Sequence, residues 1–258
     1  MIPVMAPIVP PPRSDRPLTT LQRVLSKAGL ASRTQACRWI AARRMRVNDV
    51  VIVDPDHWVD PAVDRITLDG RPVRTVAPAH FVVHKPCGYV TTRRDKLGRP
   101  TVFELLPRDA PYVFNVGRLD LDSSGLLILT NDSVLTERLT NPRHEVSKTY
   151  RIETAVPLDD RALEALRRGV ELDDGPTRPA VVERADHGVT VTITEGRNRQ
   201  VRRMIRAIGT EVVRLERIAI GPLTIAGLPE GGCRALTAEE LDALRTAAGI
   251  TPAARRTP

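Results

Sequence analysis

A polar turn stands directly before an apolar run in the segment GRLDLDSSGLLILTND (117–132). The turn carries Arg118 and Asp120, and the run 126–129 is typical of a buried central strand. Asp120 would then lie at the rim of a sheet, where functional side chains are often displayed. A carboxylate placed there could act as a nucleophile or a general base. It could equally cap the turn or pair with Arg118, and the local pattern favours neither role.

Tyr150 is the second candidate, because the chain has only 3% aromatic residues. It alternates with Ile152, Thr154 and Val156, so these side chains would share one face of a strand. That alternation is also typical of a core tyrosine. Both readings stay open from the residues alone.

Arginines crowd the segment EGRNRQVRRMIRAIG (195–209). Val201, Ile205 and Ile208 would form the buried stripe of a helix, which leaves Arg202 and Arg206 together on one flank. A carboxylate that must stay ionised while enclosed needs a neighbouring cation. The arginines either all bind phosphate groups, or one of them serves as that cation.

Common cofactor and metal signatures are missing from the sequence. It contains no G-x-G-x-x-G after a strand, no Walker A loop, no H-E-x-x-H and no G-x-S-x-G. The five histidines have no metal-ligand spacing, and the three cysteines are far apart. These observations disfavour a methyltransferase, a helicase or a hydrolase, and we expect neither a metal nor a disulfide scaffold.

The balance of charges points to a polyanionic partner. The 258 residues include 39 Lys and Arg against 31 Asp and Glu, a formal net charge of +8. No apolar run approaches the roughly 18–20 residues of a membrane-spanning helix, and prolines interrupt the first residues. We therefore expect a soluble cytoplasmic protein that makes no membrane contact.

The first third of the chain predicts a small basic unit after a disordered proline-rich tail (1–17). Two short helices would begin at possible capping boxes, Thr19 with Gln22 and Ser32 with Gln35. Short strands would follow at 46–47, near Val59 and at 65–68, with a hairpin turn at Asp69-Gly70. Residues 71–79 would form a linker.

Seven basic residues and no acidic one lie between residues 21 and 46. A face of one sign repels itself unless phosphates neutralise it, so this unit is expected to bind nucleic acid. Its predicted contacts are Arg23, Lys27, Arg33, Arg38, Arg43 and Arg44.

The remaining two thirds predict an α+β domain with a mixed, mainly antiparallel sheet flanked by helices. Strand-like runs occupy 81–83, 89–92, 126–130, 149–156, 189–194 and 212–220. Helical stretches occupy 133–139, 159–168, 201–208 and 238–248, the last with a capping box of Thr237 and Glu240. We place this domain at 80–249, before a disordered tail at 250–258.

Residues 18–76 resemble the S4-like RNA-binding domain, in which two helices precede short strands. MRVNDVVIVDPDHWVDPAVDRITLDGRPV (45–73) is similar to its second half, with Asp49 where glycine is common. The resemblance implies that this unit grips RNA through its backbone and shape.

Several motifs in order resemble the RsuA/RluB family of ribosomal RNA pseudouridine synthases, over about 18–248. These are HKPCGYVTT (84–92), LGRPTVFELLP (97–107), the GRLD segment, HEVSKTYRI (144–152), the arginine-rich segment and RLERIAIGPL (214–223). Ser123 stands where threonine is usual, which keeps the hydroxyl. The motifs look closer to the large-subunit rRNA enzymes than to the small-subunit one.

The resemblance implies isomerisation of one uridine in ribosomal RNA without a cofactor or a metal. It implies three catalytic residues: Asp120, Tyr150 and Arg202. Tyr150 would stack on the uracil, with proton transfer as a second possible role, and Arg202 would be the partner of Asp120, with Arg203 as the second choice. Four further arginines would bind RNA: Arg118, Arg197, Arg199 and Arg203. We expect a monomer. The alternatives are a non-catalytic rRNA-binding or ribosome-assembly factor, and the same chemistry on small-subunit rRNA.

Overall fold

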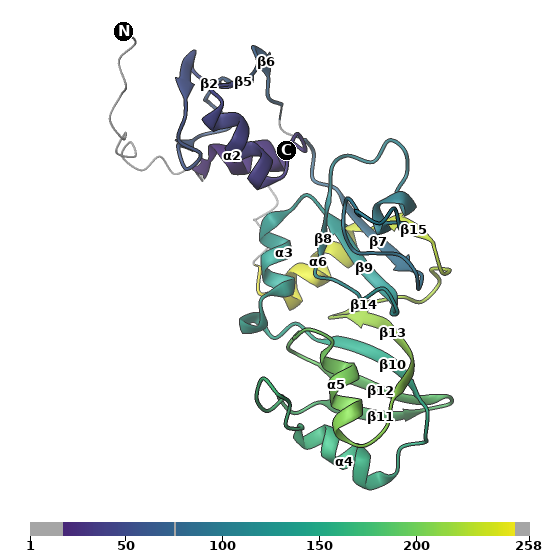
Figure 1. Ribbon diagram of the computed structural model, residues 1–258. Coiled ribbons are helices and arrows are strands. Elements are labelled where there is room, and N and C mark those ends of the chain that lie inside the picture. Colours follow the sequence, from purple (N-terminus) through teal and green to yellow (C-terminus); the bar gives the residue numbers. More distant parts are fainter. Residues whose placement is uncertain (1–17, 75, 251–258) are drawn as a thin grey trace. The chain divides into compact units, whose positions relative to one another are not determined.

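Two compact units make up the computed structural model, which describes residues 18–74 and 76–250 (Figure 1). The first unit ends at Pro78 and the second begins at Ala79. The predicted tail at 1–17 and all but the first residue of the tail at 250–258 lie outside the described residues. No helix in the described ranges is long and apolar enough to cross a membrane.

The first unit packs two helices against a small antiparallel sheet. The helices are α1 (Leu21–Lys27) and α2 (Arg33–Ala41). The sheet has the order β3-β2-β5-β6, and its strands are β2 (Met45–Val47), β3 (Val50–Ile52), β5 (Ile66–Leu68) and β6 (Arg71–Pro72). A separate pair joins β1 (Thr19–Thr20) to β4 (Trp58–Val59). Apolar side chains from both helices and the sheet form one buried cluster, which includes Leu21, Leu25, Ala36, Ile40 and Met45.

Two local predictions for the first unit are wrong. Thr19 belongs to β1, so Thr20 precedes α1 and makes no side-chain cap, and the predicted box with Gln22 does not form. The predicted linker also starts later, because Arg71–Pro72 closes the hairpin at Asp69-Gly70 as β6. At the second helix, Ser32 Oγ accepts the N–H of Gln35 at 3.2 Å.

One sheet runs through the second unit in the order β11-β12-β10-β13-β9-β7-β15, with β14 on β13 and β8 on β9. Among the described ladders, β9 with β13 is parallel and the others are antiparallel. The α+β prediction with a mainly antiparallel mixed sheet is therefore confirmed. The strands are β7 (His80–Lys85), β8 (Phe114–Val116), β9 (Ser124–Thr130), β10 (Lys148–Thr154), β11 (Val181–Ala185), β12 (Gly188–Ile193), β13 (Val212–Ile220), β14 (Leu223–Thr224) and β15 (Cys233–Ala235).

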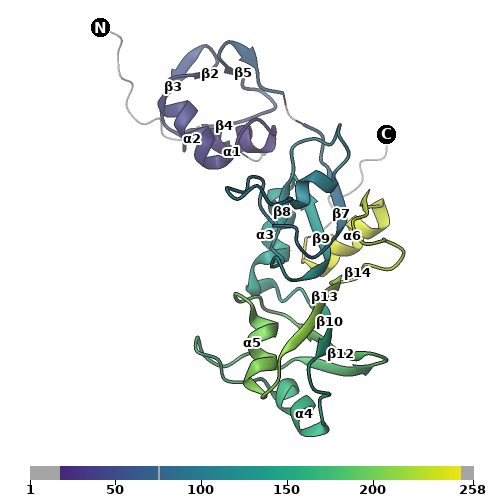
Figure 2. The same cartoon turned by 45° about the vertical axis from the view of Figure 1, so that its right-hand side comes forward.

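Helices flank both halves of this sheet, as Figures 1 and 2 show. They are α3 (Ser133–Thr140), α4 (Asp160–Arg168), α5 (Gln200–Ala207) and α6 (Ala238–Ala247), with short 3-10 turns η1 (Val102–Leu105) and η2 (Pro142–His144). The predicted capping box of Thr237 and Glu240 is present at α6. Ile250 does not begin a tail, since its N–H donates to Arg245 O at 2.8 Å.

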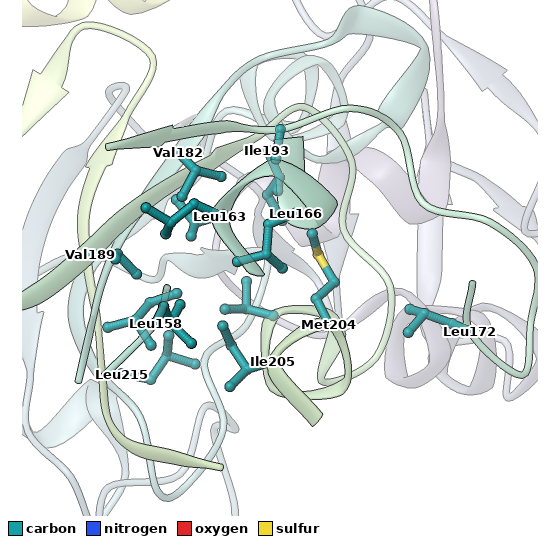
Figure 3. Packing of buried hydrophobic residues seen from close by; sticks show 14 residues of the cluster. Leu158, Leu163, Leu166, Leu172, Val182, Val189, Ile193, Met204, Ile205 and Leu215 are labelled. Atoms are coloured by element: carbon teal, nitrogen blue, oxygen red, sulfur yellow. The ribbon is translucent and has the colours of Figure 1, made fainter. Parts of the chain in front are cut away.

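Three buried clusters hold the second unit together. In the first, Leu163 and Leu166 of α4 meet Met204 and Ile205 of α5 over the β10–β12 half of the sheet (Figure 3). The second joins α3 and α6 to strands β7, β8 and β9, and the third lies between β7, β9 and η1. The two halves meet where β9 pairs with β13.

The strand predicted at 89–92 is absent, because only Val90 forms a bridge, to Thr101. Within the described residues of the second unit, four short strands were missed instead: β8, β11, β14 and β15. They carry few apolar residues in alternation, and their pairing depends on neighbours that are distant in the sequence.

Candidate active site

The polar turn between β8 and β9 carries Asp120 and is held by hydrogen bonds to a neighbouring segment. Thr91 Oγ1 donates to Leu119 O at 2.8 Å, and the N–H of Gly88 donates to Leu121 O at 2.8 Å. β9 beyond the turn is buried along its whole length, as the apolar run predicted. Asp120 therefore stands at the rim of a buried strand with its backbone fixed on both sides.

A buried lysine stabilises the backbone of this turn. Lys85, at the end of β7, has no exposed surface, and its Nζ donates to Ser123 O at 2.6 Å and to Pro86 O at 2.9 Å. Burial lowers the pKa of Lys85 to about 8, and the nearby charges of Cys87, Asp120 and Asp122 oppose that shift. This lysine lies in the motif HKPCGYVTT (84–92), but the sequence did not predict a role for it.

A pocket of about 380 Å³ lies beside the turn, whose residues form part of its lining. Asp120 and Tyr150 both line it, although thirty positions separate them in the sequence. The lining also includes five basic side chains: Arg118, Lys148, Arg197, Arg199 and Arg217. The pocket thus combines a carboxylate, an aromatic ring and a concentration of positive charge.

Arg199, and not Arg202, pairs with Asp120. Arg199 Nη1 lies 3.5 Å from Asp120 Oδ2, and its Nη2 lies 2.8 Å from Asp122 Oδ2. This contradicts the expected Arg202–Asp120 pair. Arg199 adopts a left-handed backbone conformation (φ 47°) directly before α5, so its position relative to the helix could not be read from the helical period.

Arg202 instead holds the backbone of the turn. Its Nη2 donates to Asp122 O at 2.7 Å and to Ser123 Oγ at 3.3 Å. Ser123 has this hydroxyl in common with the usual threonine, and the hydroxyl here accepts a hydrogen bond from Arg202. The hydrogen bonds from Arg199, with the charge of Arg202, lower the pKa of the Asp122 carboxyl below its ordinary value.

Tyr150 lies on β10, between Arg217 of β13 and Val191 of β12 in the sheet register. Its ring is half-buried and packs against two of the apolar clusters while it also lines the pocket. The structure thus supports both readings of Tyr150, as part of the core and as part of the site.

Arg217 is a pocket residue that sequence reasoning missed. Its side chain is buried, with 3% of the residue exposed, and its Nε donates to Leu126 O at 2.8 Å. Its Nη2 has no hydrogen-bond partner among the described residues. Since an unsatisfied buried donor is costly, a bound molecule could stabilise this group. Because Arg217 lies within a largely apolar strand, the local sequence did not indicate that it belongs to the pocket.

Lys148 also faces the pocket and was not predicted. Its Nζ donates to Val146 O at 3.0 Å. Burial lowers the pKa of Lys148 to about 8, and the positive charge of Arg217 acts in the same direction.

Two arginines predicted to bind RNA are instead engaged by an acidic loop. Arg203 Nη1 lies 2.9 Å from carboxylate oxygens of both Asp173 and Asp174, and Arg197 Nη1 lies 3.1 Å from Asp174 Oδ1. Arg118, in contrast, is exposed and lines the pocket. Of the four arginines predicted to bind RNA in this unit, Arg197 and Arg203 thus have carboxylate partners outside the turn.

The basic residues of the first unit form a separate group. Arg23, Lys27, Arg33, Arg38 and Arg43 are all exposed. Arg44 differs, because its Nη2 pairs with Asp69 at 2.5 Å and its guanidinium stacks on Trp39 at 4.9 Å.

Comparison with known proteins assigns the class. A family model described as RNA pseudouridylate synthase matches residues 79–207, which contain Asp120, Tyr150 and the arginine-rich segment. The chain belongs to the family of RNA pseudouridine synthases. This confirms the family inferred from the sequence motifs.

Relatives match nearly the whole chain. A protein of Aquifex aeolicus described as an uncharacterized RNA pseudouridine synthase is 37% identical over 89% of this chain and 95% of its own. The ribosomal large subunit pseudouridine synthase B of Bacillus subtilis is 36% identical over 88% of this chain and 96% of its own. A crystal structure of a pseudouridylate synthase superimposes with a TM-score of 0.64 at 31% identity, covering 88% of this chain and 99% of that one.

Proposed function

We propose that this protein converts a specific uridine of large-subunit ribosomal RNA to pseudouridine. The observation that carries the proposal is one pocket in which Asp120, Tyr150 and several cations meet. The names of the similar proteins from Bacillus subtilis and Pseudomonas aeruginosa support the large subunit as the source of the RNA.

The reaction needs a carboxylate and a way to hold a free base. The bond between uracil N1 and the ribose breaks, the base turns, and C5 joins the same sugar carbon while C5 loses a proton and N1 gains one. Asp120 either attacks the ribose or removes a proton from it. The pair with Arg199 places a positive charge beside the carboxylate and fixes its direction.

The other pocket residues position the nucleotide in this proposal. The ring of Tyr150 stacks on uracil, a contact worth about 1–3 kcal/mol. Arg217 donates a hydrogen bond from Nη2 to the bound nucleotide, since no described residue accepts one from this atom. Arg202 holds the turn through Asp122 and Ser123, so it positions Asp120 without touching it.

The first unit is proposed to act as an S4-like RNA-binding domain. Its two helices, short strands and exposed basic residues suit contacts to phosphates, which supply affinity but little sequence information. We also propose that the enzyme acts as a monomer. We place the enzyme in the cytoplasm.

The test is to map pseudouridines in large-subunit rRNA after incubation with the wild-type protein and with Asp120→Asn. We expect one modified uridine with the wild type and none with the variant. The RNA affinity of the variant should stay within a few-fold of the wild type, because the carboxylate is not part of a phosphate contact.

Two outcomes would count against the proposal. Wild-type turnover by Asp120→Asn would remove Asp120 from the chemistry. RNA binding without any modified uridine would favour the non-catalytic factor, and modification of small-subunit rRNA would correct the substrate.

A further inference from the structure

A row of residues that line the pocket or support its turn crosses the middle of the large sheet. Gly125 of β9 pairs with Lys85 of β7 on one side and with Arg217 of β13 on the other. Arg217 pairs in turn with Tyr150 of β10. Paired residues share one face of a sheet, so the side chains of Lys85, Arg217 and Tyr150 project to the same side.

The opposite face carries a second row at the neighbouring positions of the same strands. Successive residues of a strand point to opposite faces, so the residue next to each member of the first row faces away from the pocket. The members of the second row are His84 of β7, Glu216 of β13 and Arg151 of β10. A contact within this row therefore joins the three strands from the face opposite the pocket.

Glu216 is the centre of the second row, and only 6% of this residue is exposed. Its Oε2 accepts a hydrogen bond from Arg151 Nη1 at 3.0 Å. Its Oε1 lies 3.2 Å from His84 Nε2, which is an ion-pair distance without the alignment of a hydrogen bond. The ring of His84 is itself held, because its Nδ1 lies 2.9 Å from Leu228 O. The carboxylate thus contacts β10 on one side and, across β9, β7 on the other.

The two halves of the sheet meet at the junction that this cluster spans. Within the described residues, the ladder between β9 and β13 has two registered pairs, Glu216 with Ser124 and Arg217 with Gly125. The ladder between β10 and β13 has seven. So short a ladder defines the angle between the halves weakly, and side-chain contacts across the junction supply further constraints.

We propose that Glu216 is a positioning residue, which joins β7, β13 and β10 and so fixes Arg217 and Tyr150 relative to the catalytic turn. The inference rests on the proposed function, which assigns these two side chains to the nucleotide. A buried carboxylate adds little net stability, since the cost of its desolvation offsets the attraction to its partners. It does favour one arrangement of those partners. A site needs this, because a displacement of about 1 Å can lower a rate about 100-fold.

The experiment compares Glu216→Gln, which removes the charge at nearly constant size, with Glu153→Gln as a matched control. Glu153 also belongs to the β10–β13 ladder, and its Oε1 lies 3.8 Å from Arg214 Nη1, but its side chain is 38% exposed. We expect Glu216→Gln to lower the single-turnover rate at saturating enzyme about tenfold or more, with RNA affinity within about threefold of the wild type. Glu153→Gln should change neither quantity. An unchanged rate in Glu216→Gln would overturn the proposal.

A double variant tests whether Glu216 acts through Arg151. Arg151→Met removes the charge and keeps a long side chain, so it should lose part of the rate. If the two residues act as one unit, Glu216→Gln combined with Arg151→Met should be no slower than Glu216→Gln alone. Losses that multiply would show that the two residues act independently, which contradicts the proposal.

Fluorine NMR of protein labelled with 3-fluorotyrosine supplies a readout that needs no turnover. The chain has three tyrosines, Tyr89, Tyr112 and Tyr150, and the variant Tyr150→Phe identifies the resonance of Tyr150. Glu216→Gln should shift or broaden this resonance and leave that of Tyr112 unchanged, whereas Glu153→Gln should leave both in place. A residue that only stabilises the fold would lower the melting temperature without moving the Tyr150 resonance of the folded protein.

The positioning role and the proposed function fail in different ways. A Tyr150 resonance that stays in place in Glu216→Gln would refute the positioning role, even if the wild-type protein modifies rRNA. Absence of pseudouridine with the wild-type protein would refute the proposed function, even if the resonance moves. If Glu216→Gln does not fold, Arg151→Met replaces it in both measurements, because the side chain of Arg151 is half-exposed.

Discussion

Tyr150 joins the apolar core to the pocket, so its hydroxyl and its ring can be tested apart. Tyr150→Phe keeps the ring and should bind RNA with near-normal affinity. If the hydroxyl moves a proton, turnover should fall by about 10²–10⁴-fold, as measured in single-turnover assays.

Thermal melting supplies the control for Tyr150. The Phe variant should melt close to the wild type, because its ring still fills the same space. Tyr150→Ala should lose base positioning and some stability, up to about 3–5 kcal/mol if the ring is mainly a core residue. Full activity in the Phe variant, with a large loss of stability in the Ala variant, would assign Tyr150 to the core alone.

Lys148 provides a prediction about pH. Its pKa of about 8 means that the ammonium is charged below pH 8 and neutral above it. A pocket cation is therefore lost as the pH rises, and RNA affinity should weaken through that range. Lys148→Arg should remove this alkaline decline, because arginine stays charged. Titration of RNA affinity across roughly one pH unit on either side of this pKa checks the prediction. An identical decline in both proteins would show that another group is responsible.

Among the elements of the sheet, β9 and β13 can meet because of Gly125. It has φ +117°, and a Cβ there would lie 2.3 Å from Arg217 O and 2.4 Å from Arg217 N. Gly125 therefore fixes both the parallel pairing and the position of Arg217. Neither role is visible in the local pattern of residues.

Gly125→Ala should reduce stability much more than Gly175→Ala does. Gly175 has a similar φ of +97°, but a Cβ there would have no atom within 4 Å, so this variant isolates the backbone strain. That strain is worth about 1–3 kcal/mol, and the clash at Gly125 should add about 1–3 kcal/mol or more. Urea unfolding measures both, and equal losses would mean that the strands separate easily.

For the molecule as a whole, the first unit should supply affinity and the second unit chemistry. Changing Arg33, Arg38 and Arg43 together to Ala should weaken RNA binding. The slope of log affinity against log salt should decrease by about 0.7–0.9 for each phosphate that the protein no longer neutralises. Single-turnover rates at saturating enzyme should stay near the wild-type value.

Arg44→Ala is the matched control for this slope. Its guanidinium is already bonded to Asp69, so its removal should change the slope less than removal of an exposed arginine that binds a phosphate. An unchanged slope in the triple variant would show that these side chains contact solvent and not RNA.

The family, the α+β class and the elements with strong periodicity, such as β9, β13 and α6, could all be predicted from the amino-acid sequence. Their apolar patterns and caps are local, so they can be read along the chain. The same local pattern placed Asp120 at the rim of a buried strand and identified Tyr150 as a residue with two possible roles.

The cations that meet Asp120 could be found only in the folded chain. Arg199 replaces Arg202 as its partner because a left-handed residue precedes α5, and a helical period does not predict that turn. Arg217 and Lys148 enter the pocket through the pairing of β13 with β10. Contacts between distant strands depend on packing of the whole domain, and no local pattern of residues carries that information.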